Sequence, residues 1–145
     1  MAVILRTAQL SVAPFAAWEI VDRFMRADIR VFSFIEENRI DGDLRTVVSG
    51  GGELEQPELN ITIAPEHMYA SYTLLGSRFW DGTYHHASMR VLDTGDGRCR
   101  FDWITDVAPD SAAAKISDFI DRYGLWSDLL EVLETGKEAP PPVAG

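Results

Sequence analysis

The feature that most constrains this chain is a region of period-two hydrophobic alternation from about residue 32 to residue 107. Turn-forming residues interrupt this region at 41–43, 49–52, 64–65, 76–82 and 94–97. Alternation is typical of strands with one buried face, and short turns join antiparallel neighbours. The pattern therefore predicts six consecutive strands that form an antiparallel meander.

The clearest hairpin is expected to pair residues 84–92 with residues 98–107 across the Gly95-Asp96-Gly97 turn. In its second strand, large or apolar side chains alternate with mostly charged ones. This alternation predicts an inner face made of Cys99, Phe101, Trp103, Thr105 and Val107.

Helical periodicity appears on both sides of the meander. After a β-rich run at 3–11, Pro14 is placed to begin a helix that ends near residue 26. Its apolar stripe is predicted to comprise Phe15, Trp18, Val21 and Met25. A second helix is expected at 110–135, with one continuous apolar stripe made of Ile116, Phe119, Tyr123, Trp126, Leu130 and Leu133.

The length of 145 residues fits one domain, which we expect to span residues 1–136. Residues 137–145 contain three consecutive prolines and no apolar period, so they are predicted to form a disordered tail. The net charge of −10 argues against nucleic acid and anionic membranes as partners. A lone Cys99 excludes an intrachain disulfide, and no signal-peptide pattern or spanning segment is recognised, so a cytoplasmic location is expected.

Several short motifs, in order, are similar to those of one family. They are Ala13-Pro14 with Ala17-Trp18 and Phe24, then residues 42–46 (Gly-Asp-Leu-Arg-Thr), the Gly50-Gly51-Gly52 turn, Tyr72-Thr73-Leu74, residues 85–91, and Trp103 six residues before Pro109. Together they resemble the START/Bet v 1-like superfamily, particularly its polyketide cyclase/dehydrase and lipid transport branch, over about residues 3–134.

The resemblance implies an α+β helix-grip fold, in which a curved antiparallel sheet wraps around a long C-terminal helix and encloses a cavity. It also implies that the loop at 49–52 is a gate and that the loop at 76–83 is a facing latch. Ligand-binding residues are then expected on the inner strand faces, the latch and the final helix: Tyr72, Leu74, Phe79, Trp80, Ala87, Met89, Phe101, Trp103, Phe119 and Tyr123.

The chain departs from the branch where chemistry is expected. Relatives often carry an inward Tyr at the start of the sixth strand, and the preferred alignment places His85 there. Another register would turn Tyr84 and His86 inward instead. Relatives also carry an inward Glu at the position where Pro57 stands, and a proline inside a strand predicts a bulge or an edge. The orientation of Glu55 and Glu58 is therefore left open.

His85 is the candidate catalytic residue, because an imidazole in a cavity wall can transfer a proton near neutral pH. A structural, hydrogen-bonded His is the alternative. Arg45 is a candidate to pair with a ligand carboxylate, although an acid on the sheet surface is the favoured partner. No metal site is expected, since the adjacent His85 and His86 point to opposite faces, and Cys99 is expected to be a small core residue.

Two functions follow from these expectations. The first is binding of a hydrophobic, aromatic or polyketide-like small molecule, with cyclisation or dehydration of that molecule and no cofactor. The alternative is a non-catalytic protein that binds or transports a lipid, quinone or signalling ligand. An adaptor role for the aromatic loop at 79–80 comes third, and a homodimer is left open.

Overall fold

The computed structural model describes residues 1–76 and 82–142. Seven antiparallel strands form one curved sheet in the order β1-β7-β6-β5-β4-β3-β2, so every strand of the meander pairs with its sequence neighbour. The predicted six-stranded meander and the predicted strand at 3–11 are thus confirmed. The strands are β1 (Ala2–Leu10), β2 (Glu37–Asp41), β3 (Leu44–Ser49), β4 (Leu54–Ala64), β5 (Tyr69–Leu74), β6 (Tyr84–Asp93) and β7 (Cys99–Ala108).

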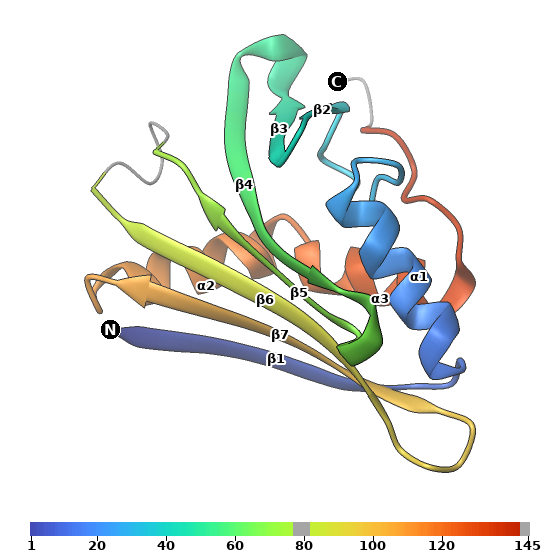
Figure 1. Ribbon diagram of the computed structural model, residues 1–145. Helices are drawn as coiled ribbons and strands as arrows, with labels where there is room; N and C mark the ends of the chain where they lie inside the picture. Colours follow the sequence, from blue (N-terminus) through green and yellow to red (C-terminus); the bar gives the residue numbers. More distant parts are fainter. Residues whose placement is uncertain (77–81, 143–145) are drawn as a thin grey trace.

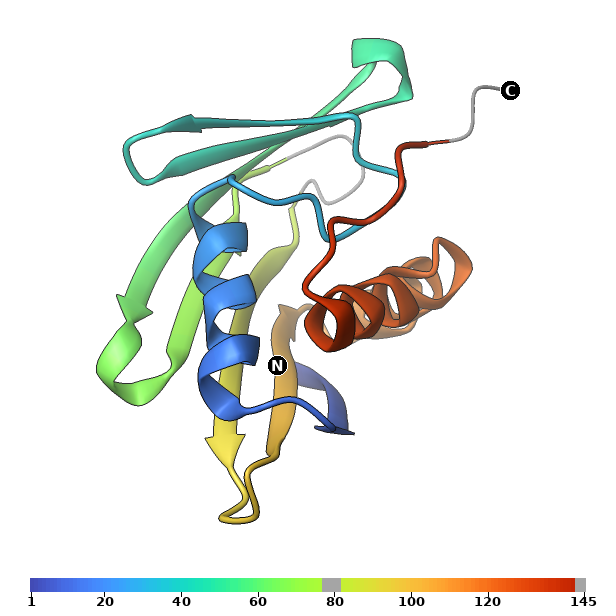
Figure 2. The same ribbon diagram turned by 90° about the vertical axis from the view of Figure 1, so that its right-hand side faces the viewer.

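Three helices lie on one side of this sheet, as Figure 1 and Figure 2 show. They are α1 (Pro14–Met25), α2 (Ala112–Arg122) and α3 (Leu125–Thr135). Helix α1 packs against β6 and β7. Helix α2 packs against β1 and β7, and α3 packs against β1 and α1. Among the described residues, no helix has both the length and the apolar character needed to cross a membrane.

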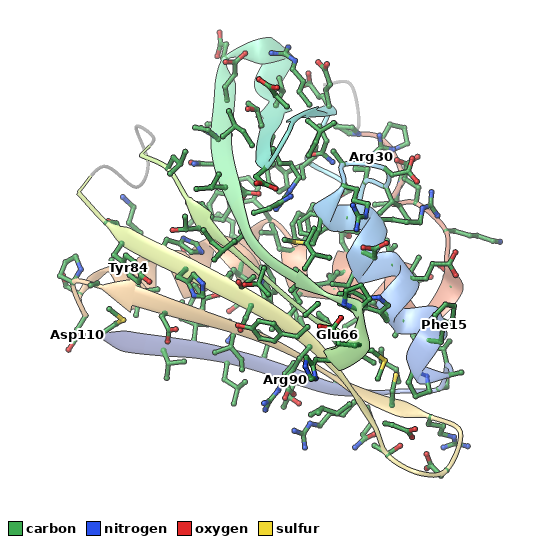
Figure 3. The ribbon with its side chains drawn as sticks, in the orientation of Figure 1. Phe15, Arg30, Glu66, Tyr84, Arg90 and Asp110 are labelled. Atoms are coloured by element: carbon green, nitrogen blue, oxygen red, sulfur yellow. The ribbon has the colours of Figure 1, made fainter. Side chains whose placement is uncertain are left out.

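The inner face of the sheet follows the predicted alternation. Cys99, Phe101, Trp103, Thr105 and Val107 of β7 are all buried. The same alternation operates in β6, where His85 is buried and Tyr84 is about half exposed. This pattern settles the register in favour of an inward His85, and Figure 3 shows the outward-facing Tyr84 and Arg90 of β6.

Strand β4 differs from its expected shape. Pro57 pairs in register with Thr46 of β3, and the irregularity lies between Asn60 and Thr62, where Ile61 is left unpaired. The predicted disturbance at Pro57 was therefore misplaced by a few residues. As a result, β4 turns Gln56 and Glu58 inward, whereas Glu55 points to solvent.

The predicted C-terminal helix is divided into two helices at Gly124. This glycine has a left-handed φ of 65°, a conformation that L-residues with a side chain adopt at a cost. The break shifts the buried stripe of the second half by one position or more. Leu125, Leu129, Val132 and Leu133 are buried there, and Tyr123 is about half exposed.

Two further expectations need correction. Phe15 is largely exposed, because the buried face of α1 is centred on Ala17, Val21 and Phe24, and Figure 3 shows Phe15 at the solvent end of the helix. The segment after Gly136, predicted to be disordered, lies along the α1–β2 connection as far as it is described (Figure 1 and Figure 2). Ala139 is buried there and exchanges hydrogen bonds with Arg30.

Candidate functional site

An internal chamber of about 80 Å³ lies between the inner face of the sheet and the final helices. Most of its wall is aromatic or aliphatic, and the titratable groups that the described part of the chain places on it are Arg45, Glu58, Tyr72 and His85. The apolar wall residues are Phe24, Phe32, Phe34, Ile35, Val47, Leu54, Leu74, Trp103, Ile116, Phe119, Ile120 and Leu125, and Gln56 adds an amide.

The meander places the charged pair of the chamber. Arg45 of β3 and Glu58 of β4 are directly opposite each other in the ladder, and both side chains point inward. The Nη1 atom of Arg45 lies 2.8 Å from the Oε2 atom of Glu58. Arg45 is fully buried and the Glu58 side chain is 11% exposed, so this is an ion pair inside the core and not a surface pair. The favoured expectation of a surface partner for Arg45 was therefore wrong.

Aromatic rings cover the Arg45 guanidinium. Its central carbon lies 4.1 Å from the ring centroid of Phe24 and 5.1 Å from that of Tyr72, which are cation–π distances. Within residues 1–76 and 82–142, the Nε, Nη1 and Nη2 atoms of Arg45 make no hydrogen bond. A buried guanidinium normally satisfies several of its five N–H groups, so this one has an uncommon surplus of donors.

Burial raises the pKa of the Glu58 carboxyl, and the positive charge of Arg45 opposes that effect. Burial likewise raises the pKa of the Tyr72 hydroxyl, with the neighbouring Glu58 charge as the second cause. Both groups therefore favour their protonated forms more than they would in water.

His85 enters the same chamber from β6 and is 8% exposed. Burial lowers its pKa to about 4, and the adjacent His86 adds a smaller effect of the same sign. At neutral pH the imidazole is therefore uncharged and able to accept a proton. Glu58 and His85 are thus pushed in opposite directions from their usual pKa values, a pattern found in sites with paired acid and base roles.

An outer pocket of about 320 Å³ adjoins the chamber. The two spaces share Phe34, Leu54 and Phe119 as wall residues. The outer pocket is also lined by Ser49, Gly50, Glu53 and Tyr123, so it lies between the glycine loop and the α2–α3 junction. All three glycines of the loop, Gly50 to Gly52, have positive φ, which makes this turn a site where glycine is required.

Comparisons with known proteins support the fold at low sequence identity. No family model and no curated protein sequence matches the chain. A solution structure from Thermobifida fusca has a TM-score of 0.73 and 19% identity, covering 99% of this chain and 100% of that one. Norcoclaurine synthase from Thalictrum flavum has a TM-score of 0.70 and 17% identity, with 92% and 84% covered. The Zhui aromatase/cyclase from Streptomyces sp. R1128 has a TM-score of 0.69 and 15% identity, with 92% and 93% covered.

This chain has the Bet v 1-like helix-grip fold. The predicted fold class is confirmed, and the likeness to these structures extends to the fold alone, since their identities are below one fifth.

The helix-grip fold brings half of the predicted ligand-binding residues to the chamber or its outer pocket. Those on the chamber wall are Tyr72, Leu74, Trp103 and Phe119, together with the candidate catalytic His85, while Tyr123 lines the outer pocket. Ala87, Met89 and Phe101 are buried in the packed core, where Phe101 stacks on Trp126 at a centroid distance of 6.0 Å. Phe79 and Trp80 lie outside the described residues.

Sequence reasoning missed the inward position of Glu58 and the burial of Arg45. The alternation in 44–49 and 54–60 contained the signal, because a β3–β4 hairpin with this register turns both residues inward. Pro57 obscured this signal, because a proline inside a strand predicts a bulge or an edge. Cys99 is buried as expected, and burial raises the pKa of its thiol. No group of three metal-ligating side chains occurs among the described residues.

Proposed function

We propose that this protein binds a hydrophobic, aromatic or polyketide-like small molecule in the chamber and promotes its cyclisation or dehydration. The observation that carries the proposal is the presence of two oppositely perturbed titratable groups, Glu58 and His85, on the wall of one apolar chamber. Titratable groups with strongly perturbed pKa values in a cleft cluster at functional sites.

The composition of the wall supports an aromatic ligand. Phe24, Phe32, Phe34, Trp103 and Phe119 present rings to the chamber, and rings pack favourably on other rings. Norcoclaurine synthase, which has the same fold, was crystallised with dopamine and hydroxybenzaldehyde, and the Streptomyces protein is an aromatase/cyclase. Ligand pockets usually measure roughly 300–1,000 Å³. The inner chamber is smaller than that, so a ligand would extend into the outer pocket or displace Phe34 or Phe119.

The proposed chemistry is loss of water from a β-hydroxy ketone. Neutral His85 takes the proton from the carbon between the carbonyl and the hydroxyl-bearing carbon, and a carbon–carbon double bond forms. The carbon–oxygen bond breaks, and Glu58, which takes up a proton when the complex forms because burial raises its pKa, supplies the proton with which the hydroxyl leaves as water. The proton held by His85 then returns to Glu58, which completes the cycle with no cofactor.

Ligand uptake can be tested with N-phenyl-1-naphthylamine, a neutral apolar dye whose fluorescence rises in apolar surroundings. We expect saturable uptake of one dye per chain. Phe34→Ala and Phe119→Ala should each change the dye affinity by severalfold, whereas the exposed Phe15→Ala should leave it unchanged. Absence of saturable uptake by the wild-type protein would remove the basis of the proposal.

Catalysis can be tested with 4-hydroxy-4-phenylbutan-2-one, which loses water to give 4-phenylbut-3-en-2-one. The wild-type protein should accelerate this dehydration, and Glu58→Gln should reduce the acceleration by about 10²-fold or more. The matched control is Glu55→Gln, an exposed carboxylate on the same strand. Equal rates for wild type and Glu58→Gln would refute the role of Glu58.

A non-catalytic binding or transport protein is the alternative, and one observation favours it. A histidine whose pKa is lowered to about 4 is a weak base. Saturable dye uptake without any acceleration of the dehydration would therefore select this alternative. Native mass spectrometry of protein taken from its own source would then identify the co-purifying ligand.

A further inference from the structure

We propose that the natural ligand carries a carboxylate on an apolar body, and that this carboxylate takes the place of Glu58 beside Arg45. The inference rests on the proposed function, because it names the chemical class of the ligand in the same chamber. It is drawn from the unsatisfied donors, the position and the pairing of Arg45.

The donors of Arg45 are more numerous than its partners. The side chain is fully buried and forms part of the chamber wall. Among the described residues its three nitrogens make no hydrogen bond, and the contact with Glu58 is an ion pair through Nη1 without hydrogen-bond geometry. Leaving several N–H groups of a buried cation unsatisfied is costly, so a ligand that accepts from them gains that cost back on binding.

The geometry of the site favours a planar anion. The rings of Phe24 and Tyr72 cover the Arg45 guanidinium, so a ligand can approach this group only along its edge. At that edge the N–H groups form a fork that fits the two oxygens of a carboxylate. Low surrounding polarity strengthens such a pair relative to the same pair in water.

Glu58 can yield its place because it tolerates protonation. Ligand carboxylate and Glu58 carboxylate together would leave two negative charges beside one positive charge in an apolar space. Among residues 1–76 and 82–142, the other titratable groups on the chamber wall are Tyr72 and His85, both neutral near pH 7 in view of the directions of their shifts. Uptake of one proton by Glu58 therefore restores neutrality, and burial already favours its protonated form.

The protonated Glu58 that results is the form needed to donate a proton to a leaving hydroxyl. A carboxylate on the substrate would thus both anchor one end and set the protonation state of the acid. This coupling links recognition to the proposed dehydration.

The test compares 2-naphthoic acid with 2-naphthamide, two probes of nearly the same shape, by calorimetry at pH 7. We expect wild-type protein to bind the acid at least about tenfold more tightly than the amide. Arg45→Met should abolish this preference, and Arg39→Met, which removes an exposed arginine of a surface ion pair, should retain it. Arg45→Lys should retain part of the preference, because it keeps the charge and loses the fork.

The same titrations, repeated in phosphate and in Tris, give the number of protons taken up on binding, because the two buffers have different enthalpies of ionisation. Binding of the acid should take up about one proton per complex in the wild type and none in Glu58→Gln. Equal or weaker binding of the acid relative to the amide by the wild-type protein would overturn the proposal, whatever the variants do. Proton uptake near zero would overturn the exchange with Glu58.

The two proposals fail in different ways. If neither N-phenyl-1-naphthylamine nor either naphthalene probe binds, the ligand-binding function itself is refuted. If the dye and the amide bind and the acid binds no more tightly, the function stands and the carboxylate inference is refuted.

Discussion

Protonation of His85 should destabilise the folded protein in mild acid. The imidazole is buried in an apolar chamber, which lowers its pKa from 6.5 to about 4. A group whose folded pKa lies below its unfolded pKa stabilises the fold when it is neutral, and that contribution is lost as the pH falls from about 6.5 to about 4. A shift of this size corresponds to about 3 kcal/mol when the loss is complete, at about 1.4 kcal/mol per pKa unit.

At pH 5 the unfolded chain would bind nearly one proton at this position and the folded chain very little. The free energy of unfolding should therefore be about 2 kcal/mol lower at pH 5 than at pH 7.5 because of His85 alone. Glu58, whose pKa is raised, acts in the opposite sense and stabilises the fold as the pH falls. The pH dependence of stability in the wild type alone would combine both effects, so the contribution of His85 must be taken as the difference between the wild type and a variant that lacks this histidine.

The assay is urea unfolding followed by tryptophan fluorescence at pH 7.5 and pH 5, for wild type, His85→Gln and His67→Gln. His67 lies in the exposed turn after β4 and serves as the matched control. The loss of stability between the two pH values should be about 2 kcal/mol smaller in His85→Gln than in the wild type. It should be the same in His67→Gln as in the wild type. An equal loss in all three proteins would refute the assignment of a buried, neutral His85.

Three further changes test the architecture by urea unfolding. Gly124→Ala should lower the free energy of unfolding by about 1 kcal/mol, because the residue has a left-handed φ, and Gly124→Asn should lower it less. An alanine variant as stable as the wild type would contradict the helix break. Asp102→Ala should lower the free energy of unfolding by about 2 kcal/mol, since this buried carboxylate accepts hydrogen bonds from Thr7, Arg90 and Arg100. Asp106→Ala should leave stability nearly unchanged, and equal losses in the two variants would contradict a stabilising role for these hydrogen bonds. Removal of residues 137–145 should cost about 1–2 kcal/mol through lost bonds to Arg30, and an unchanged stability would show that Ala139 is not docked in solution.

The sheet could be predicted from the sequence because period-two alternation is a local property of each strand. The β6–β7 hairpin is the clearest case. Its turn residues fix the register, and the register in turn fixes which side chains are inward. His85 could be placed on the inner face by the same reasoning.

The final helices were harder to predict because a single backbone angle controls them. A continuous stripe from Ile116 to Leu133 assumes unbroken helical phase, and the left-handed Gly124 interrupts that phase. A glycine inside a helix costs about 1 kcal/mol relative to alanine, which is compatible with an unbroken helix. Whether the helix ends at Gly124 depends on the packing of α2 and α3 against the sheet, which the sequence pattern does not contain.

The charged pair was also beyond local reasoning. The inward orientation of Glu58 depends on whether the strand irregularity falls at Pro57 or at Ile61, and ladder pairing with β3 and β5 decides that point. Burial of Arg45 depends on Phe24, which arrives from a different element. Such tertiary contacts leave little trace in the residues next to each site.

The most direct test of ligand binding is to locate a bound apolar molecule by methyl NMR. With isoleucine methyl groups labelled, N-phenyl-1-naphthylamine should shift the signals of Ile35, Ile116 and Ile120, which line the chamber. The signals of the exposed Ile40 and Ile61 should stay in place. Shifts confined to Ile40 and Ile61, with the three chamber isoleucines unchanged, would contradict binding inside the helix-grip fold.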